Sequence, residues 1–290
     1  MPEKKVTPMI RLIRCVVAIA VLLLGSSLSF AMHADVVPSS LFPGDVFLVK
    51  VTGIDASVRT SALFEGIEVP LEDCGQGCLS GIGAVSIDTK PGERGILVTS
   101  GRERTNIALT VGTPRFPELH LKLPESKVSL SAEDLERVKK EEAMLAELWK
   151  KGGPRLFRSD FIMPLPNQIA TVFGARRILN EKAVSVHRGI DVKGRLGEKV
   201  AASNAGRVVL AKNLFFGGNT LIVDHGAGIY TIYMHLEKFA VSPGDVVARG
   251  DTIGLVGATG RATGPHLHFG VKILTINVNP VALINLRTGD

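Results

Sequence analysis

Aromatic residues are scarce in this 290-residue chain, at 5% of the total, with one Trp and two Tyr. The sequence has no aromatic stacking platform and no arginine-rich arm, so no nucleic-acid partner is expected. Glycine is frequent, with 31 residues, which favours turn-rich β structure. The composition, 45% hydrophobic and 21% charged, is that of a globular protein, and the length allows about two domains.

The N-terminal apolar run, Cys15–Gly25, has eleven residues and is shorter than the ~20 residues that cross a bilayer. Four basic residues precede it, and Ser29 and Ala31 stand where a signal peptidase reads small side chains. This order predicts a signal peptide over residues 1–31. We therefore expect the protein in the periplasm, the cell envelope or secreted, without stable membrane insertion after cleavage. An uncleaved segment would instead act as an anchor.

Cysteine is also rare, with three in the chain, and two of them bracket a short glycine-rich segment, Cys74–Cys78. A three-residue loop between them would place the two thiols opposite each other across a hairpin. In an oxidising compartment this arrangement favours a disulfide, with two unpaired thiols as the alternative. Two sulfurs do not make a structural zinc site, which needs four ligands.

Residues 36–125 show short alternating strands separated by turns, for example Val46–Val51, Ile96–Val98 and Asn106–Val111. This spacing predicts an immunoglobulin-like β-sandwich. No group of side chains in it is suited to catalysis, so a binding or spacer module is expected.

A helical linker is predicted over residues 126–158. Its helix should run from Ser131 to Lys151, with Ser131 as the N-cap, Asp134 as its capping partner, and the Gly152–Pro154 segment as the stop.

Residues 159–290 return to short apolar runs punctuated by glycine, with no long helical period. The predicted fold class of the whole chain is thus all-β, ending in a compact β domain. The predicted strands lie at Val200–Ala201, Gly206–Leu210, Thr220–Val223, Ile229–Tyr233, Asp251–Val256 and Leu267–Val271.

Histidine is concentrated in this last region, where five of the seven in the chain lie between positions 187 and 268. His266 and His268 are two apart on a predicted strand, so their side chains point to one face while Leu267 and Phe269 point into the core. A catalytic zinc takes three nitrogen or oxygen ligands and a water. Five side chains are available, which leaves two imidazoles for acid–base and oxyanion chemistry. They are His187, Asp191, His235, His266 and His268.

Residues from about 161 to 280 resemble the lysostaphin (LytM-type) family of zinc metallopeptidases, which are peptidoglycan endopeptidases. The resemblance covers roughly 40% of the chain. Its motifs are Phe161–Pro164, Phe173–Gly174, His187–Asp191, Gly218–Asn219, Asp224–Gly226, Tyr233–His235, Pro243–Asp245, Gly250–Asp251, Ile253–Gly254, Thr259–Gly260, Thr263–His268 and Asn279–Pro280.

The resemblance implies a LytM-type antiparallel β peptidase domain over residues 159–290 that hydrolyses peptide cross-links of peptidoglycan. It implies one Zn2+ per chain, held by His187, Asp191 and His268. His235 and His266 would then be the unliganded catalytic pair that assists attack of a metal-activated water on the scissile carbonyl. His225 is interpreted as structural. The bond that is cut and any protein partner are not indicated.

Three other kinds of site or function require residues that can be checked in the sequence. A thermolysin-type site is excluded because the chain has no His-Glu-x-x-His motif. A biotinyl or lipoyl carrier hairpin over Val246–Gly260 would need a lysine at its exposed turn, where the chain has Arg261. A catalytically inactive LytM-like activator of other cell-wall hydrolases stays open as the alternative, although the complete set of zinc residues argues against it.

Overall fold

The computed structural model describes residues 31–121, 130–150, 152–179 and 183–288. The predicted signal peptide therefore lies almost wholly outside the described residues. In the parts that are described, no helix combines the length and the apolar composition needed to cross a membrane.

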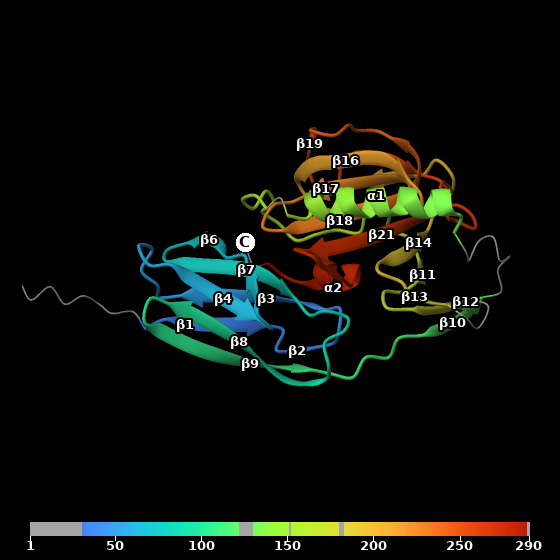
Figure 1. Cartoon of the computed structure of the whole chain (residues 1–290). Coiled ribbons are helices and arrows are strands. Elements are labelled where there is room, and N and C mark those ends of the chain that lie inside the picture. The colour runs from blue at the N-terminus through green and yellow to red at the C-terminus, as the bar shows by residue number, and fades with distance from the viewer. Residues whose placement is uncertain (1–30, 122–129, 151, 180–182, 289–290) are drawn as a thin grey trace, which may run out of the picture. The chain divides into compact units, whose positions relative to one another are not determined.

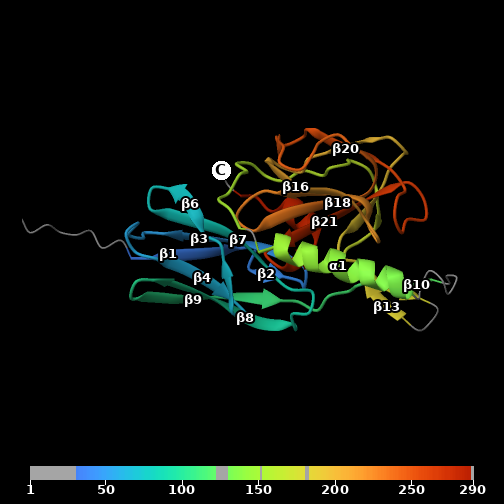
Figure 2. The same ribbon diagram turned by 45° about the horizontal axis from the view of Figure 1, so that its top comes forward.

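The first part of the described chain is a β-sandwich of two sheets (Figures 1 and 2). One sheet contains, in spatial order, β1 (His33–Val37), β3 (Val46–Thr52), β7 (Cys78–Ala84) and β6 (Glu72–Gly75). The other contains β2 (Ser40–Leu41), β9 (Glu103–Val111), β8 (Gly92–Ser100), β4 (Thr60–Phe64) and β5 (Ile67–Val69). Both sheets contribute to one core, which includes Phe47, Phe64 and Val98. The predicted strands are confirmed, while the immunoglobulin-like assignment stays a prediction.

Cys74 and Cys78 form the predicted disulfide, at the end of the β6–β7 hairpin. The hairpin differs in detail from the expectation. Gln76 and Gly77 alone form the turn, and Cys78 pairs with Gly75 because the register shifts between Asp73 and Gly75.

Helix α1 (Ala132–Leu148) has Ser131 as its N-cap, as predicted, because the Ser131 side chain accepts a hydrogen bond from the Asp134 N–H. The helix ends earlier than expected, with Trp149 as the C-cap. One side of its last two turns is apolar and packs on the outer face of the large sheet described next.

The C-terminal region is built on a ten-stranded sheet whose pairings are all antiparallel. Its main path contains β11 (Ile169–Thr171), β14 (Ile190–Lys193), β21 (His266–Ile273), β18 (Ile229–Phe239), β17 (Gly218–Asp224), β16 (Gly206–Leu214) and β19 (Val246–Val247). Three more strands join it at the side: β15 (Lys199–Ala201), β20 (Thr252–Val256) and β22 (Ile276–Val278). Each predicted strand of this region has its counterpart.

A small third sheet contains β10 (Glu118–Leu121), β12 (Arg176–Leu179) and β13 (Ala183–Val186). In it, the chain that leaves the sandwich pairs in parallel with β12. A short helix, α2 (Pro280–Asn285), was not predicted; Asn279 caps it and Pro280 occupies its first turn. Its six residues are too few to produce a helical period in the sequence.

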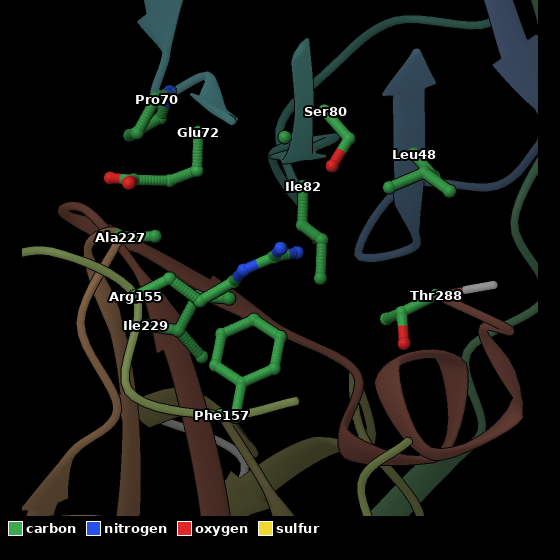
Figure 3. A pocket seen from close by; sticks show the side chains of 11 residues that line it. Leu48, Pro70, Glu72, Ser80, Ile82, Arg155, Phe157, Ala227, Ile229 and Thr288 are labelled. Carbon is green, nitrogen blue, oxygen red and sulfur yellow. The ribbon is translucent and has the colours of Figure 1, made fainter. Parts of the chain in front are cut away.

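The sandwich and the C-terminal region share apolar contacts, since Val46, Ile82 and Ala84 belong to the same core cluster as Phe157 and Phe173. A small pocket lies between them, with Leu48 and Ile82 on one side and Arg155 and Phe157 on the other (Figure 3). None of the five candidate side chains lines this pocket.

Candidate metal centre and active site

Three neighbouring strands of the large sheet carry the candidate side chains. Asp191 of β14 is directly opposite His268 of β21, and His268 in turn is opposite Met234 of β18. His187 precedes β14, and His235 follows Met234. Leu267 and Phe269 are fully buried, so β21 presents its imidazoles on one face and its apolar side chains on the other, as the alternation predicts.

The structure brings His187, Asp191 and His268 together. The Nε2 atom of His187 lies 3.0 Å from Oδ1 of Asp191 and 3.0 Å from Nδ1 of His268. The same Nδ1 atom of His268 lies 2.9 Å from Asp191 Oδ1. These are the three residues that offer metal-ligand atoms within 4.8 Å of one another in the described chain.

The chemistry of these three atoms fits a cation. The other ring nitrogen of His187, Nδ1, lies 2.9 Å from the Val172 carbonyl oxygen. A carbonyl only accepts, so Nδ1 carries the proton and, in a neutral imidazole, Nε2 presents a lone pair. A lone pair aimed at a carboxylate oxygen and at a second imidazole is favourable when a positive charge lies between them. Ligand atoms of a tetrahedral zinc stand roughly 3.3 Å apart, which is close to the observed spacing.

Asp191 is in the form that a metal ligand requires. Burial by itself would raise its pKa, but hydrogen bonds from His187 and His268 in their protonated form, together with the positive charge of those rings, outweigh burial and lower the pKa of the carboxyl well below its usual range. A cation bound between the three side chains would take the place of those protons. The side chain is therefore a carboxylate at neutral pH.

His235 and His266 lie beside this triad without joining it. Their ring centroids are 4.7 Å apart, and that of His235 is 6.2 Å from His268. Nδ1 of His235 donates to the Thr259 carbonyl at 2.8 Å, and Nδ1 of His266 donates to the Gly264 carbonyl at 2.9 Å. Each ring therefore presents Nε2, and that of His266 lies 3.8 Å from Asp191 Oδ1. Burial, reinforced by the charges of the neighbouring histidines, lowers the pKa of His235 to about 4.

His225 lies apart, in the interior. Its Nδ1 donates to the Ala205 carbonyl at 2.7 Å, and its Nε2 accepts from the Thr231 hydroxyl at 2.7 Å. The Thr231 oxygen lies 2.9 Å from the Tyr233 hydroxyl, which accepts from the Ser203 N–H. Burial lowers the pKa of His225 to about 4. These contacts fit the structural role that was expected for it.

The carbonyls of Val172, Thr259 and Gly264 were not identified from the sequence. They fix which nitrogen of His187, His235 and His266 is free, yet they come from backbone groups with no signature in residue type. A carbonyl that orients a histidine in this way is common around metal sites.

One segment of the chain matches a known family. Residues 185–280 match the model described as Peptidase family M23. This segment holds all five candidate side chains, and it belongs to that family.

Individual relatives match a part of the chain. The chain is 38% identical over 126 residues to the Vibrio cholerae peptidoglycan DD-endopeptidase ShyA, covering 42% of this chain and 29% of that protein. It is 37% identical over 116 residues to the Neisseria meningitidis DD-carboxypeptidase/endopeptidase Mpg, covering 40% of this chain and 27% of that protein. The chain thus spans less than a third of the length of these curated relatives.

A solved structure is similar over a longer stretch. The crystal structure of a Pseudomonas aeruginosa protein assigned to peptidase M23 has a TM-score of 0.64 and 27% identity. The similarity covers 84% of this chain and 94% of that one, so it includes both the sandwich and the large sheet.

Proposed function

We propose that this protein is an exported, zinc-dependent endopeptidase that hydrolyses peptide cross-links of bacterial peptidoglycan. The observation that carries the proposal is the convergence of the three ligand atoms of His187, Asp191 and His268, with two further imidazoles beside them. Membership of residues 185–280 in peptidase family M23 supports the reaction class.

The proposed ligands of the zinc ion are His187, Asp191 and His268. When bound, zinc is a Lewis acid that polarises a peptide carbonyl and makes a water molecule more acidic. The buried Asp191 carboxylate supplies the negative charge that a dication requires in this partly desolvated place. The Val172 carbonyl holds His187 in the orientation and tautomer that a ligand needs.

His235 and His266 are proposed to handle protons and charge. Each donates Nδ1–H to a backbone carbonyl, so each keeps the Nε2 lone pair for the reaction. One of them accepts the proton of the attacking water, and the proton is then available for the oxyanion or the leaving amine. Their 4.7 Å ring separation allows both to reach the same reacting carbonyl.

The substrate and the location rest on other support. Relatives named peptidoglycan DD-endopeptidases match 42% and 30% of this chain. Export rests on the basic, apolar and small-residue order of residues 1–31. The segments 214–217 and 176–185 are the proposed determinants of which peptide bond is cut. The second contains β12 and the start of β13, and its residues 180–182 lie outside the described residues.

The test is digestion of purified peptidoglycan by the full-length mature protein, with products identified by mass spectrometry. We expect cleaved cross-links from the zinc-loaded protein, no cleavage after chelation, and recovery when zinc is restored. A protein that binds no metal and releases no product would refute the proposal and leave the inactive activator as the function. The presence of all five side chains disfavours that alternative.

A further inference from the structure

Helix α1 packs on the face of the large sheet that also carries His268, because Met234, directly opposite His268, belongs to the apolar cluster that the helix joins (Figures 1 and 2). The apolar part of this contact joins the helix to strands β16, β17 and β18. Its members are Met144, Leu145, Leu148 and Trp149 on the helix side, and Val209, Leu210, Leu214, Ile222, Tyr230, Ile232 and Met234 on the strands. A helix of high charge content is thus fixed to the domain and does not bridge solvent.

The helix also reaches the turn between β16 and β17 through polar contacts. Oε2 of Glu141 accepts a hydrogen bond from the Phe215 N–H at 2.8 Å, and Oε1 accepts from Nε of Arg137 at 2.8 Å. Nη2 of Arg137 donates to Oδ1 of Asn213 at 3.2 Å. The Glu141 side chain is only 14% exposed. A charge-assisted bond at this degree of burial holds a backbone amide more firmly than water does.

The same turn contacts His235 directly. The His235 N–H donates to the Gly217 carbonyl at 2.7 Å, two residues beyond the amide that Glu141 holds. A second connection runs through Thr259, whose hydroxyl accepts from the Asn219 N–H at 2.9 Å and whose carbonyl accepts from the His235 ring at 2.8 Å. Both the backbone and the ring of His235 therefore depend on where this turn lies.

His235 needs such support because its backbone is in the left-handed region, with φ of 64°. This conformation is disfavoured for a residue with a side chain and persists where the surroundings impose it. The surroundings here are tightly packed: a Cβ on Gly260 would lie 2.2 Å from the Gly218 nitrogen and 2.7 Å from the Phe216 carbonyl oxygen. The turn and the 259–260 loop consequently move together or not at all.

We propose that Glu141 of α1 is a positioning residue for His235. Its carboxylate fixes the Phe215–Gly217 turn, and the turn fixes the backbone and the ring orientation of the histidine. The proposal rests on the catalytic role proposed above for His235. The M23 segment spans residues 185–280. The proposal makes helix α1, which lies upstream of that segment, a part of the active-site framework.

The test compares three variants of the full-length mature protein. Glu141→Ala removes the acceptor, and Glu141→Gln keeps one oxygen for the Phe215 N–H. Glu142→Ala is the matched control, because it removes the same charge from the next, exposed position of the helix. The readouts are kcat and KM on a cross-linked muropeptide, bound zinc, and hydrogen exchange of the Phe215 and His235 amides.

We expect Glu141→Ala to lower kcat by roughly ten- to a hundredfold, because displacement of a reacting group by about 1 Å costs up to a hundredfold. KM and bound zinc should change little, and exchange of both amides should accelerate. Glu141→Gln should be closer to the wild type than to Glu141→Ala, and Glu142→Ala should match the wild type.

Equal kcat and equal amide exchange in Glu141→Ala and Glu142→Ala would overturn the proposal. So would loss of zinc in parallel with kcat, since the effect would then be on the whole site. If the wild type cuts no muropeptide, the proposed function fails, yet the exchange of the His235 amide still decides whether Glu141 positions it.

Discussion

The sandwich and the C-terminal region are both layers of mainly antiparallel β-strands, but they differ in which polar side chains they bury. Among the described residues of the sandwich, two polar side chains are buried, Ser80 and Thr89. From position 187 onward there are ten: His187, Asp191, Ser203, Asn204, Thr220, His225, Thr231, His235, Lys272 and Thr288. Burial of a polar group is costly without a partner, so this concentration identifies the region where polarity serves the site and its support.

The largest effect should come from the ligand set. Replacing His187, Asp191 or His268 with alanine should deplete bound zinc and abolish cleavage together, because each supplies one of three protein ligands. Elemental analysis alongside muropeptide cleavage checks this. His33→Ala, which removes an exposed histidine of the sandwich, is the control and should change neither quantity. If an alanine variant of His187, Asp191 or His268 kept stoichiometric zinc, the assignment of the zinc ligands to these residues of the C-terminal region would be wrong.

The next effect separates the metal from the chemistry within the site. His235→Ala and His266→Ala should keep near-stoichiometric zinc and lose about 100-fold or more in cleavage rate, since they act on protons and charge. Elemental analysis and the muropeptide cleavage rate test this prediction. Zinc loss as complete as in His187→Ala would show that the assignment of roles is wrong.

A smaller effect is expected on the free energy of unfolding, through the buried His225, and it depends on pH. His225 has a pKa of about 4 in the folded protein, below the ~6.5 of an unfolded chain. The unfolded state therefore binds more protons between these values, and stability falls as pH drops from 7 toward 4. The loss attributable to this group at pH 5 is on the order of 2 kcal/mol.

Urea unfolding of the wild type and of His225→Gln at pH 7 and pH 5 measures this contribution. The variant should be less stable at pH 7 but should lose less on acidification. Parallel pH dependence of the two proteins would mean that His225 is not the neutral, buried group described above. At equal folded fraction, the cleavage rate of His225→Gln should stay near that of the wild type.

The smallest effect should be in the sandwich. Replacing Cys74 and Cys78 with serine opens a loop so short that the loss of unfolding free energy should not exceed about 2 kcal/mol. Cleavage by the folded variant should be unchanged. A drop in kcat without loss of zinc would show that the sandwich is coupled to the site through the contacts they share.

Much of the secondary structure could be predicted from local sequence patterns. The alternation of imidazole and apolar residues from His266 to Phe269 predicted a strand with two faces, and Ser131 predicted the start of α1. These succeed because strand alternation and helix capping depend on near neighbours. The six residues of α2 and the two-residue turn between Cys74 and Cys78 were missed, since neither has a period or a composition that distinguishes it.

By itself, the sequence determined the residue types of the site, their order and the family of residues 185–280. The tertiary structure alone decided which atoms face one another. The carbonyls of Val172, Thr259 and Gly264 select the free nitrogen of three histidines, and the left-handed backbone of His235 is imposed by a turn that Glu141 holds from 94 positions upstream. Such contacts join backbone groups distant in the chain, and a backbone carbonyl is the same in every residue, so only the folded arrangement distinguishes them.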